Sequence, residues 1–216
     1  MIRRTTVRAA AVTLALALAV TAAAAPTRPA RPGKTRVEIA TFAMGCFWSA
    51  ESQFEGQPGV LSAVSGYTGG TEQNPTYEQV SSETTGHYES VQVTFDPGVT
   101  SYEKLLDNFW HAIDPTQGNG QFCDRGRSYR SAVFGHNARQ LKLAEESRKR
   151  IEASGVLRGP IVTEIRPAGR FWPAEEYHQD FARKNPGHYG RYRVGCGRDR
   201  RLAEVWGDLA AKPAAH

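Results

Sequence analysis

The sequence predicts an α+β fold, a two-layer α/β sandwich, on the strength of two observations. Short segments that alternate β-branched or aromatic residues with polar ones, as strands do, are interleaved with segments that repeat apolar residues every three or four positions, as amphipathic helices do. No internal repeat interrupts this order. The 216-residue chain therefore has room for one compact domain with its own core.

The elements of the first half follow one another in order. Residues 36–42 (RVEIATF) alternate as in a half-buried strand, and residues 47–55 place apolar side chains along one face of a helix. Residues 60–67 (VLSAVSGY) predict a second strand, followed by a glycine-rich loop. Residues 88–95 (YESVQVTF) alternate cleanly and predict a third strand. A helix apolar on one face follows over residues 102–113.

Capping residues and a long loop mark the middle of the chain. Thr100 with Glu103 fits a capping box for the helix just described. Residues 115–128 (PTQGNGQFCDRGRS) form a polar, glycine-rich loop, and a loop of this length in a compact domain is usually functional. Residues 129–134 predict a strand. The helix expected after it is capped by Asn137 and Gln140, runs to Ser154 and stops at Gly155.

The last part of the chain is expected to contain a strand, two helices and a long coil. Residues 161–165 predict the strand, and Pro173, with acidic residues soon after it, predicts the start of a helix. Residues 185–197, rich in glycine and aromatics, are expected to be a coiled C-terminal segment. Residues 202–209 predict a short closing helix.

The N-terminus has the pattern of an export signal. Arginines precede an apolar run over residues 9–20, and small residues end it at position 25, so residues 1–25 are predicted to be a signal peptide. The run is short for a stable membrane anchor. Its paired arginines also permit twin-arginine export. Residues 26–34 follow as a proline-rich linker, residues 35–210 as a single catalytic domain, and residues 211–216 as a tail.

Net charge does not indicate a nucleic-acid partner. The chain carries 27 basic and 22 acidic residues, a formal charge of +5, but three of the arginines and none of the acids lie in residues 1–25. Without that segment the charge falls to +2. The basicity therefore belongs partly to the export signal, and no binding of nucleic acid is expected.

Cys46 is the first candidate reactive residue. It stands in GCFW, where the first strand gives way to the first helix, and unpaired amides at a helix start favour a thiolate. The flanking Phe47 and Trp48 would make the site apolar. A buried core cysteine is the alternative reading of this tetrapeptide. Cys123 and Cys196 are the other two cysteines, and three cysteines leave one unpaired, which indicates redox or catalytic chemistry.

Other cysteine and histidine chemistries fit less well. His87-x-Glu89 shares two positions with zinc deaminases, but the Pro-Cys-x-x-Cys they require is missing, and the remaining histidines lack ligand spacing. No metal site is therefore expected. A papain-like hydrolase would use Cys46 with His178 and Asn185, although the residues around Cys46 do not match that family.

Longer motifs carry a specific resemblance. GCFW is joined by residues 66–70 (GYTGG), 74–77 (NPTY), 85–89 (TGHYE) and 124–131 (DRGRSYRS). The pattern continues with residues 175–179 (EEYHQ) and Asn185-Pro186. These motifs, over about residues 38–196, resemble those of the type A peptide methionine sulfoxide reductases. The resemblance implies that family's sandwich, of ferredoxin-like kind with a long coiled C-terminal segment.

The resemblance also implies roles for single residues. Cys46 matches the nucleophile of the family, and Phe47 and Trp48 match the aromatics that hold the methyl group of the sulfoxide. Glu89 matches the acid near the sulfoxide oxygen; in an apolar pocket its pKa would be raised, which keeps a proton available. The matching hydroxyl partners and supporting acid are Tyr77, Tyr129 and Asp124.

The resemblance leaves open how the oxidised Cys46 is resolved. Attack on a sulfoxide leaves a sulfenic acid, which a second thiol must capture. Cys196, in a glycine-rich and mobile setting, is the favoured resolving residue, which predicts a Cys46–Cys196 disulfide; Cys123, beside Asp124, is the alternative. Many family members have two cysteines in the tail, whereas this chain has one.

The implied protein is a periplasmic, monomeric reductase that returns methionine S-sulfoxide, free or in proteins, to methionine. It needs no prosthetic cofactor and relies on an external dithiol such as a thioredoxin-like protein. A module that binds oxidised methionine without reducing it and a cysteine hydrolase are the alternatives. They differ in their products and in their need for dithiol.

Overall fold

The computed structural model describes residues 2 and 37–212, and every element lies in one unit that spans residues 35–216. Apart from residue 2, the expected signal peptide (1–25) lies outside the described residues, as do the linker (26–34) and residues 213–216 of the tail. Among residues 2 and 37–212, no helix is both long and apolar enough to cross a membrane.

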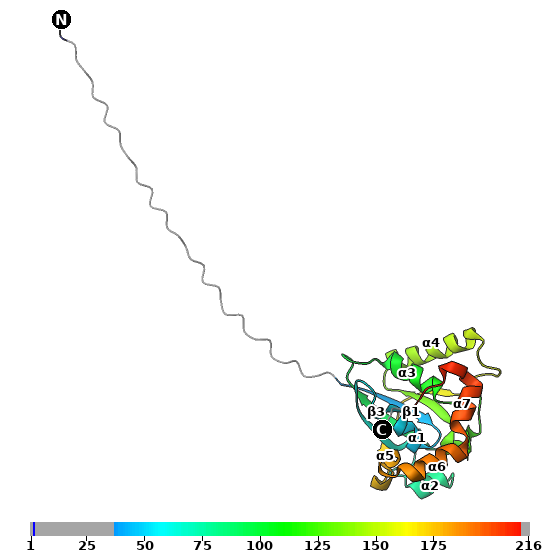
Figure 1. Cartoon of the computed structure of the whole chain (residues 1–216). Coiled ribbons are helices and arrows are strands. Elements are labelled where there is room, and N and C mark those ends of the chain that lie inside the picture. The colour runs from blue at the N-terminus through cyan, green and yellow to red at the C-terminus, as the bar shows by residue number, and fades with distance from the viewer. Residues whose placement is uncertain (1, 3–36, 213–216) are drawn as a thin grey trace. The chain divides into compact units, whose positions relative to one another are not determined.

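A six-stranded sheet forms the centre of this unit (Figure 1). Its strands lie in the order β7-β6-β1-β3-β2-β8. Neighbouring strands are antiparallel except β6 and β7, which are parallel. The strand bounds are β1 (Glu38–Met44), β2 (Val60–Thr68), β3 (Tyr88–Phe95), β6 (Ser131–Gly135), β7 (Glu164–Pro167) and β8 (Trp172–Pro173). A separate hairpin pairs β4 (Gly120–Gln121) with β5 (Asp124–Arg125).

Helices cover one face of the sheet and continue along the C-terminal part of the chain. The α-helices are α1 (Phe47–Phe54), α2 (Tyr77–Ser81), α3 (Tyr102–His111), α4 (Ala138–Ser154), α5 (Phe181–Lys184), α6 (Pro186–Cys196) and α7 (Arg198–Trp206). Short 3-10 turns occupy Arg127–Tyr129, Glu176–His178 and Gly207–Leu209. Figure 1 shows α3 and α4 close together, away from α5 and α6.

The main core lies between the sheet and α1, α3 and α4. Phe42 of β1 stacks on Phe54 of α1 and on Phe109 of α3, with ring centroids 5.3 and 5.1 Å apart. Buried Val91 and Val93 of β3 join the same cluster. Burying such side chains supplies the main favourable free energy of folding. Helices on one face of a largely antiparallel sheet confirm the α+β, two-layer fold class.

Several expected elements are present within two residues of their predicted bounds. The third strand is found over Tyr88–Phe95, and α4 begins after Asn137, whose side chain accepts from the Gln140 amide, and ends before Gly155 in the left-handed region. The capping box expected at Thr100 is wrong by one position, because Ser101 caps α3 by accepting from the Lys104 amide. A capping box between Thr76 and Gln79 instead starts α2, within a segment expected to be a loop.

Two expectations for the last part of the chain are wrong. Pro173 ends β8 and does not open a helix, because the Gln179 side chain bonds both the N–H and the C=O of Ser65 and holds this segment along β2. The coil expected over residues 185–197 is the helix α6. Proline suits its first turn, and Tyr189 is held in place because its hydroxyl shares hydrogen bonds with Ser49 and Ser52 of α1.

Candidate active site

Cys46 lies at the turn between β1 and α1, as the sequence predicts. The turn needs Gly45, whose φ is +80° and where a Cβ atom would approach the Gln121 Cβ to 2.7 Å. Cys46 is the N-cap of α1, one position before the first helical turn. Its exposed fraction is 6%, and it carries a free thiol. The close approach of Gln121 also places the β4–β5 hairpin directly against this turn.

Glu89 lies beside Cys46 because of the alternation of β3. Odd-numbered residues of that strand face the helices, and Glu89 comes first, at the level of the start of α1. Its Oε2 atom accepts the backbone N–H of Phe47 at 2.9 Å. The side chain is 1% exposed, and burial, followed by the nearby charge of Asp124, raises its pKa to about 8. Glu89 therefore carries a proton at neutral pH, as the sequence predicts.

The electrostatics of Cys46 differ from the sequence-based expectation. Burial raises the pKa of the thiol, and Glu89 and Asp124, when ionised, raise it further. A helix start alone would have lowered the pKa of Cys46. The loss of hydration on burying a thiolate, however, outweighs the stabilisation that the amides of one short helix provide. Cys46 is therefore a neutral thiol in this state.

Aromatic side chains line the site on the α1 side. Phe47 packs against Tyr77 and against His178, with centroids 6.3 and 4.8 Å apart. Trp48 stacks face to face on Phe181 at 3.7 Å. Phe47 and Trp48 thus occupy the apolar wall that the sequence predicts for them.

His178 is held in a single neutral form by Trp48. The Trp48 Nε1–H, which can only donate, lies 3.0 Å from His178 Nδ1, so Nδ1 accepts and the proton sits on Nε2. Burial lowers the pKa of His178, and its buried Nε2 atom has no hydrogen-bond partner among the described residues. His178 and Cys46 therefore form no hydrogen-bonded pair, which removes the basis for a papain-like site.

The two predicted tyrosines face the same site. Burial and then the charge of Glu89 raise the pKa of both Tyr77 and Tyr129, so both hydroxyls keep their protons. Cys46 also contributes to each shift, which places both phenols in the electrostatic neighbourhood of the thiol and the acid. The Tyr129 hydroxyl acts in the opposite direction on Tyr77 and lowers its pKa.

Asp124 connects this site to the other two cysteines. Tyr192 donates to Asp124 Oδ2 at 2.6 Å, and its hydroxyl is also in hydrogen-bonding reach of the Cys46 sulfur. Asp124 Oδ2 lies 4.0 Å from Cys196 Sγ, and Oδ1 lies 3.8 Å from Cys123 Sγ. Burial raises the pKa of Asp124, against the hydrogen bond from Tyr192.

The disulfide differs from the one expected. Cys196 is bonded to Cys123, with Cα atoms 5.0 Å apart, whereas Cys46 is free. The Cys46–Cys196 bond is therefore not the one present in this state. Cys196 is the last residue of the helix α6 and meets Cys123 at the tip of the β4–β5 hairpin, so neither sulfur lies in a coiled tail. No sequence pattern singles out Tyr192, which lies between Asp124 and Cys46.

The described residues also contain one group that could be mistaken for a metal site. Cys123, Asp124 and Cys196 bring their ligand atoms within 4.8 Å of one another. Two of the three are disulfide sulfurs, which have no thiolate to offer a metal. In this state the group is a redox site.

A free buried thiol beside a neutral carboxylic acid, with a disulfide next to it, defines a thiol-dependent oxidoreductase. Comparison with known proteins specifies it further. The family model described as peptide methionine sulfoxide reductase matches residues 38–210. The chain therefore belongs to the peptide methionine sulfoxide reductase family.

Its relatives agree on family and fold. The chain is 58% identical over 170 residues to the peptide methionine sulfoxide reductase MsrA of Bacillus licheniformis. The matched region covers 79% of this chain and 94% of that relative. The methionine sulfoxide reductase A structure of Corynebacterium diphtheriae is 35% identical, with a TM-score of 0.63 over 74% of this chain and 79% of that one. Reduced Mxr1 from Saccharomyces cerevisiae is 33% identical, with a TM-score of 0.65 over 73% and 89%.

Proposed function

We propose that this enzyme reduces methionine S-sulfoxide, free and in proteins, to methionine, with Cys46 as the nucleophile. The observation that carries the proposal is the placement of Glu89, protonated at neutral pH, against the turn that holds the free Cys46 thiol. A sulfoxide needs both groups, because its sulfur accepts a soft nucleophile while its oxygen takes up a proton.

The aromatic wall fits the other parts of this substrate. Phe47 and Trp48 would enclose the methyl group, and Tyr77 and Tyr129 would donate to the oxygen as charge develops on it. Glu89 supplies a proton to the oxygen while the Cys46 sulfur attacks, and the proton that the thiol loses returns to Glu89. Over the whole step the thiol and the sulfoxide become a Cys46 sulfenic acid and a thioether, so that the oxygen passes to Cys46.

The adjacent cysteines support a two-stage recovery of Cys46. The Cys196 thiol attacks the sulfenic acid, which forms a Cys46–Cys196 disulfide and releases water. The Cys123 thiolate then attacks Cys196, which forms the Cys123–Cys196 disulfide and returns Cys46 as a thiol. Cys196 is the better candidate for the first attack on Cys46. It lies against Asp124 Oδ2, the oxygen that accepts from Tyr192 beside Cys46, whereas Cys123 lies against Asp124 Oδ1.

The cycle closes with an external dithiol, such as a thioredoxin-like protein. Each turnover leaves the Cys123–Cys196 disulfide oxidised by two electrons, and the one remaining thiol, Cys46, cannot reduce it alone. No prosthetic cofactor takes part in any of these steps. Cys123 is the more exposed of the two cysteines and suits attack by a protein.

The pattern of residues 1–25 supports export, and we place the mature enzyme in the periplasm as a monomer without a membrane anchor. Edman sequencing of the mature protein should find an N-terminus close to Pro26. A mature protein that begins at residue 1 in the cytoplasmic fraction would overturn this placement.

One assay tests the activity. The reduced protein is incubated with a methionine S-sulfoxide peptide, with and without dithiol, and the products are weighed by mass spectrometry. Without dithiol we expect at most two methionines per chain, the first ending in the Cys123–Cys196 disulfide and the second leaving Cys46 as a sulfenic acid; with dithiol we expect continuous turnover. Binding without methionine would indicate a recognition module, and peptide cleavage that needs no dithiol would indicate a hydrolase.

A further inference from the structure

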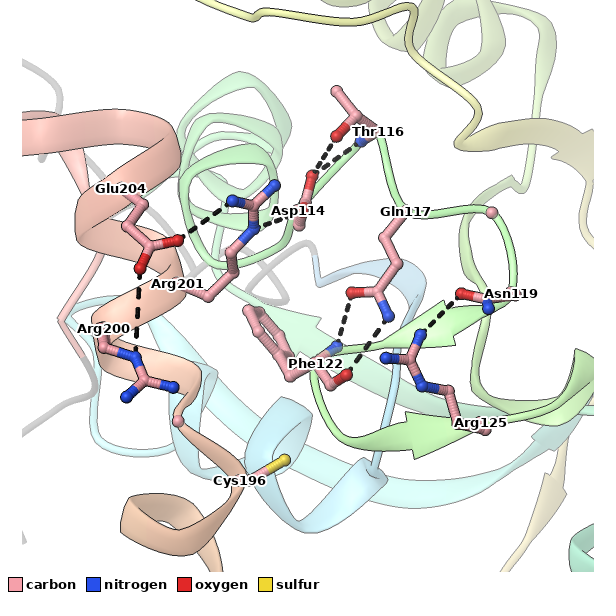
Figure 2. A pocket seen from close by; sticks show the side chains of 12 residues that line it. Asp114, Thr116, Gln117, Asn119, Phe122, Arg125, Cys196, Arg200, Arg201 and Glu204 are labelled. Carbon is pink, nitrogen blue, oxygen red and sulfur yellow. Dashed lines mark hydrogen bonds and ion pairs between the residues drawn. The ribbon is translucent and has the colours of Figure 1, made fainter.

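A pocket of about 700 Å³ opens beside Cys196 and is separate from the site at Cys46 (Figure 2). Its walls come from the loop before the β4–β5 hairpin, from the hairpin itself and from the junction of α6 with α7. Cys196 lies at its edge, whereas Cys123 does not line it. A volume of this size suits a small molecule.

The acidic side chains of the pocket are already engaged. Asp114 binds Arg201 at 2.8 Å and also accepts from the Thr116 hydroxyl. Glu204 binds Arg201 at 3.1 Å and reaches Arg200 only at 4.0 Å. Both carboxylates are therefore occupied chiefly by one arginine.

Two arginines keep positive charge available at the pocket. Arg125 makes its hydrogen bond to the neutral Asn119, at 2.8 Å. The Arg200 side chain is 84% exposed. Figure 2 shows Arg200 and Arg125 on opposite sides of Cys196. A ligand that reached the sulfur would thus pass between two guanidinium groups, which favour a carboxylate.

We propose that this pocket binds a small thiol that carries one or more carboxylates and directs its sulfur at Cys196. The inference rests on the proposed function, since it supplies a reductant for the disulfide that the catalytic cycle leaves behind. It adds a low-molecular-weight reductant, held by Arg125 and Arg200, to the protein dithiol. Such a reductant reaches Cys196 through a concave pocket, whereas a protein would meet the exposed Cys123.

The chemistry balances with two molecules of thiol. The first thiolate attacks Cys196 Sγ, which forms a mixed disulfide and releases Cys123 as a thiolate into solvent. The second attacks the sulfur of the bound molecule, so that the small disulfide leaves together with the Cys196 thiolate. The Cys123 backbone N–H, 3.2 Å from Cys196 Sγ, stabilises that thiolate.

The test compares three thiols on the oxidised protein: the anionic mercaptosuccinate, the neutral 2-mercaptoethanol and the cationic cysteamine. Loss of the Cys123–Cys196 disulfide is followed by acid quench, alkylation and mass spectrometry. Each rate is divided by the rate of the same thiol with a model disulfide peptide, which removes differences in intrinsic nucleophilicity. We expect mercaptosuccinate to show saturation, a normalised rate well above the other two, and mixed disulfide on Cys196.

Variants assign the preference to the pocket. Arg200→Ala and Arg125→Ala should each lower the normalised mercaptosuccinate rate about threefold to fivefold, the size of an exposed ion pair. Arg200→Lys should keep most of it, and Arg150→Ala, an equal loss of charge on the exposed face of α4, should keep all of it.

The proposal is overturned if all three thiols give equal normalised rates without saturation, or if the mixed disulfide forms on Cys123. It is equally overturned if the two alanine variants slow a thioredoxin-like protein but leave the small thiols unchanged, since the pocket would then dock a protein. Methionine formation by the pre-reduced chain uses no added reductant, so failure of the proposed function would be seen separately.

Discussion

Replacing Glu89 with glutamine separates the chemical role of its proton from its effect on stability. Glutamine keeps an oxygen to accept the Phe47 amide at the same place, but it has no acidic proton. Because the pKa of Glu89 is raised to about 8, the parent enzyme should lose activity as the pH rises through 8. The variant should be slower at every pH and lack this decline.

The magnitudes follow from the burial of Glu89. A general acid contributes about 100-fold to 10,000-fold, so Glu89→Gln should slow methionine formation at least about 100-fold at pH 7. The stability of Glu89→Gln, in contrast to its rate, should increase at neutral pH. The unfolded carboxyl ionises near pH 4.5, so the folded state binds the extra proton between pH 4.5 and about 8, and stability falls as the pH rises across that window. At pH 7 the loss is about 3 kcal/mol, which glutamine should recover.

The assay is a single turnover of pre-reduced enzyme with a methionine sulfoxide peptide between pH 6 and 9, combined with urea unfolding at pH 4 and 7. Glu51 provides the matched control, because it is 2% exposed and burial raises its pKa to about 7, while its partners are Ser65 and Asp180. Glu51→Gln should gain stability at pH 7 and keep its rate. An undiminished rate in Glu89→Gln would refute the assignment of the proton to Glu89.

Four further outcomes are expected. Cys46→Ser should form no methionine while peptide mapping still finds the Cys123–Cys196 disulfide; any turnover would remove Cys46 from the mechanism. Cys123→Ser should yield one methionine per chain and accumulate a Cys46–Cys196 disulfide, seen by non-reducing mass spectrometry, and sustained full turnover would contradict the two-stage recovery. His178→Leu leaves the Trp48 indole N–H without its acceptor, so the free energy of unfolding in urea should fall by about 1–3 kcal/mol and the KM for the sulfoxide peptide should rise. Unchanged values would exclude a role for this contact. Arg198→Met removes a 2%-exposed cation that donates to Met44 O and lies 4.2 Å from the Phe122 ring centroid. Quench-flow should show slower formation of the Cys123–Cys196 disulfide, while methionine release in the first turnover changes little. Equal slowing of both steps would count against a positioning role for Arg198.

Local patterns predicted the elements whose own residues dictate them. The alternation of residues 88–95 predicted β3 and the orientation of Glu89, and the Asn137 cap predicted the start of α4. The helix α6 was missed because its glycines have low helix propensity, and contacts such as Tyr189 with α1 stabilise it from a distance. The end of β8 at Pro173 was missed for the same reason, since Gln179 holds that segment against β2.

Local sequence patterns are enough to predict the α+β class, the position of Cys46 at a strand-to-helix turn and the inward orientation of Glu89, because strand alternation follows from neighbouring residues. Contacts between distant segments make Cys46 a neutral thiol, bind His178 to Trp48 and bring Cys123 and Cys196 together as the bonded pair. Those outcomes depend on which segments meet in space. The α6 terminus and the β4–β5 hairpin are 73 residues apart in the chain, and no local pattern encodes that meeting.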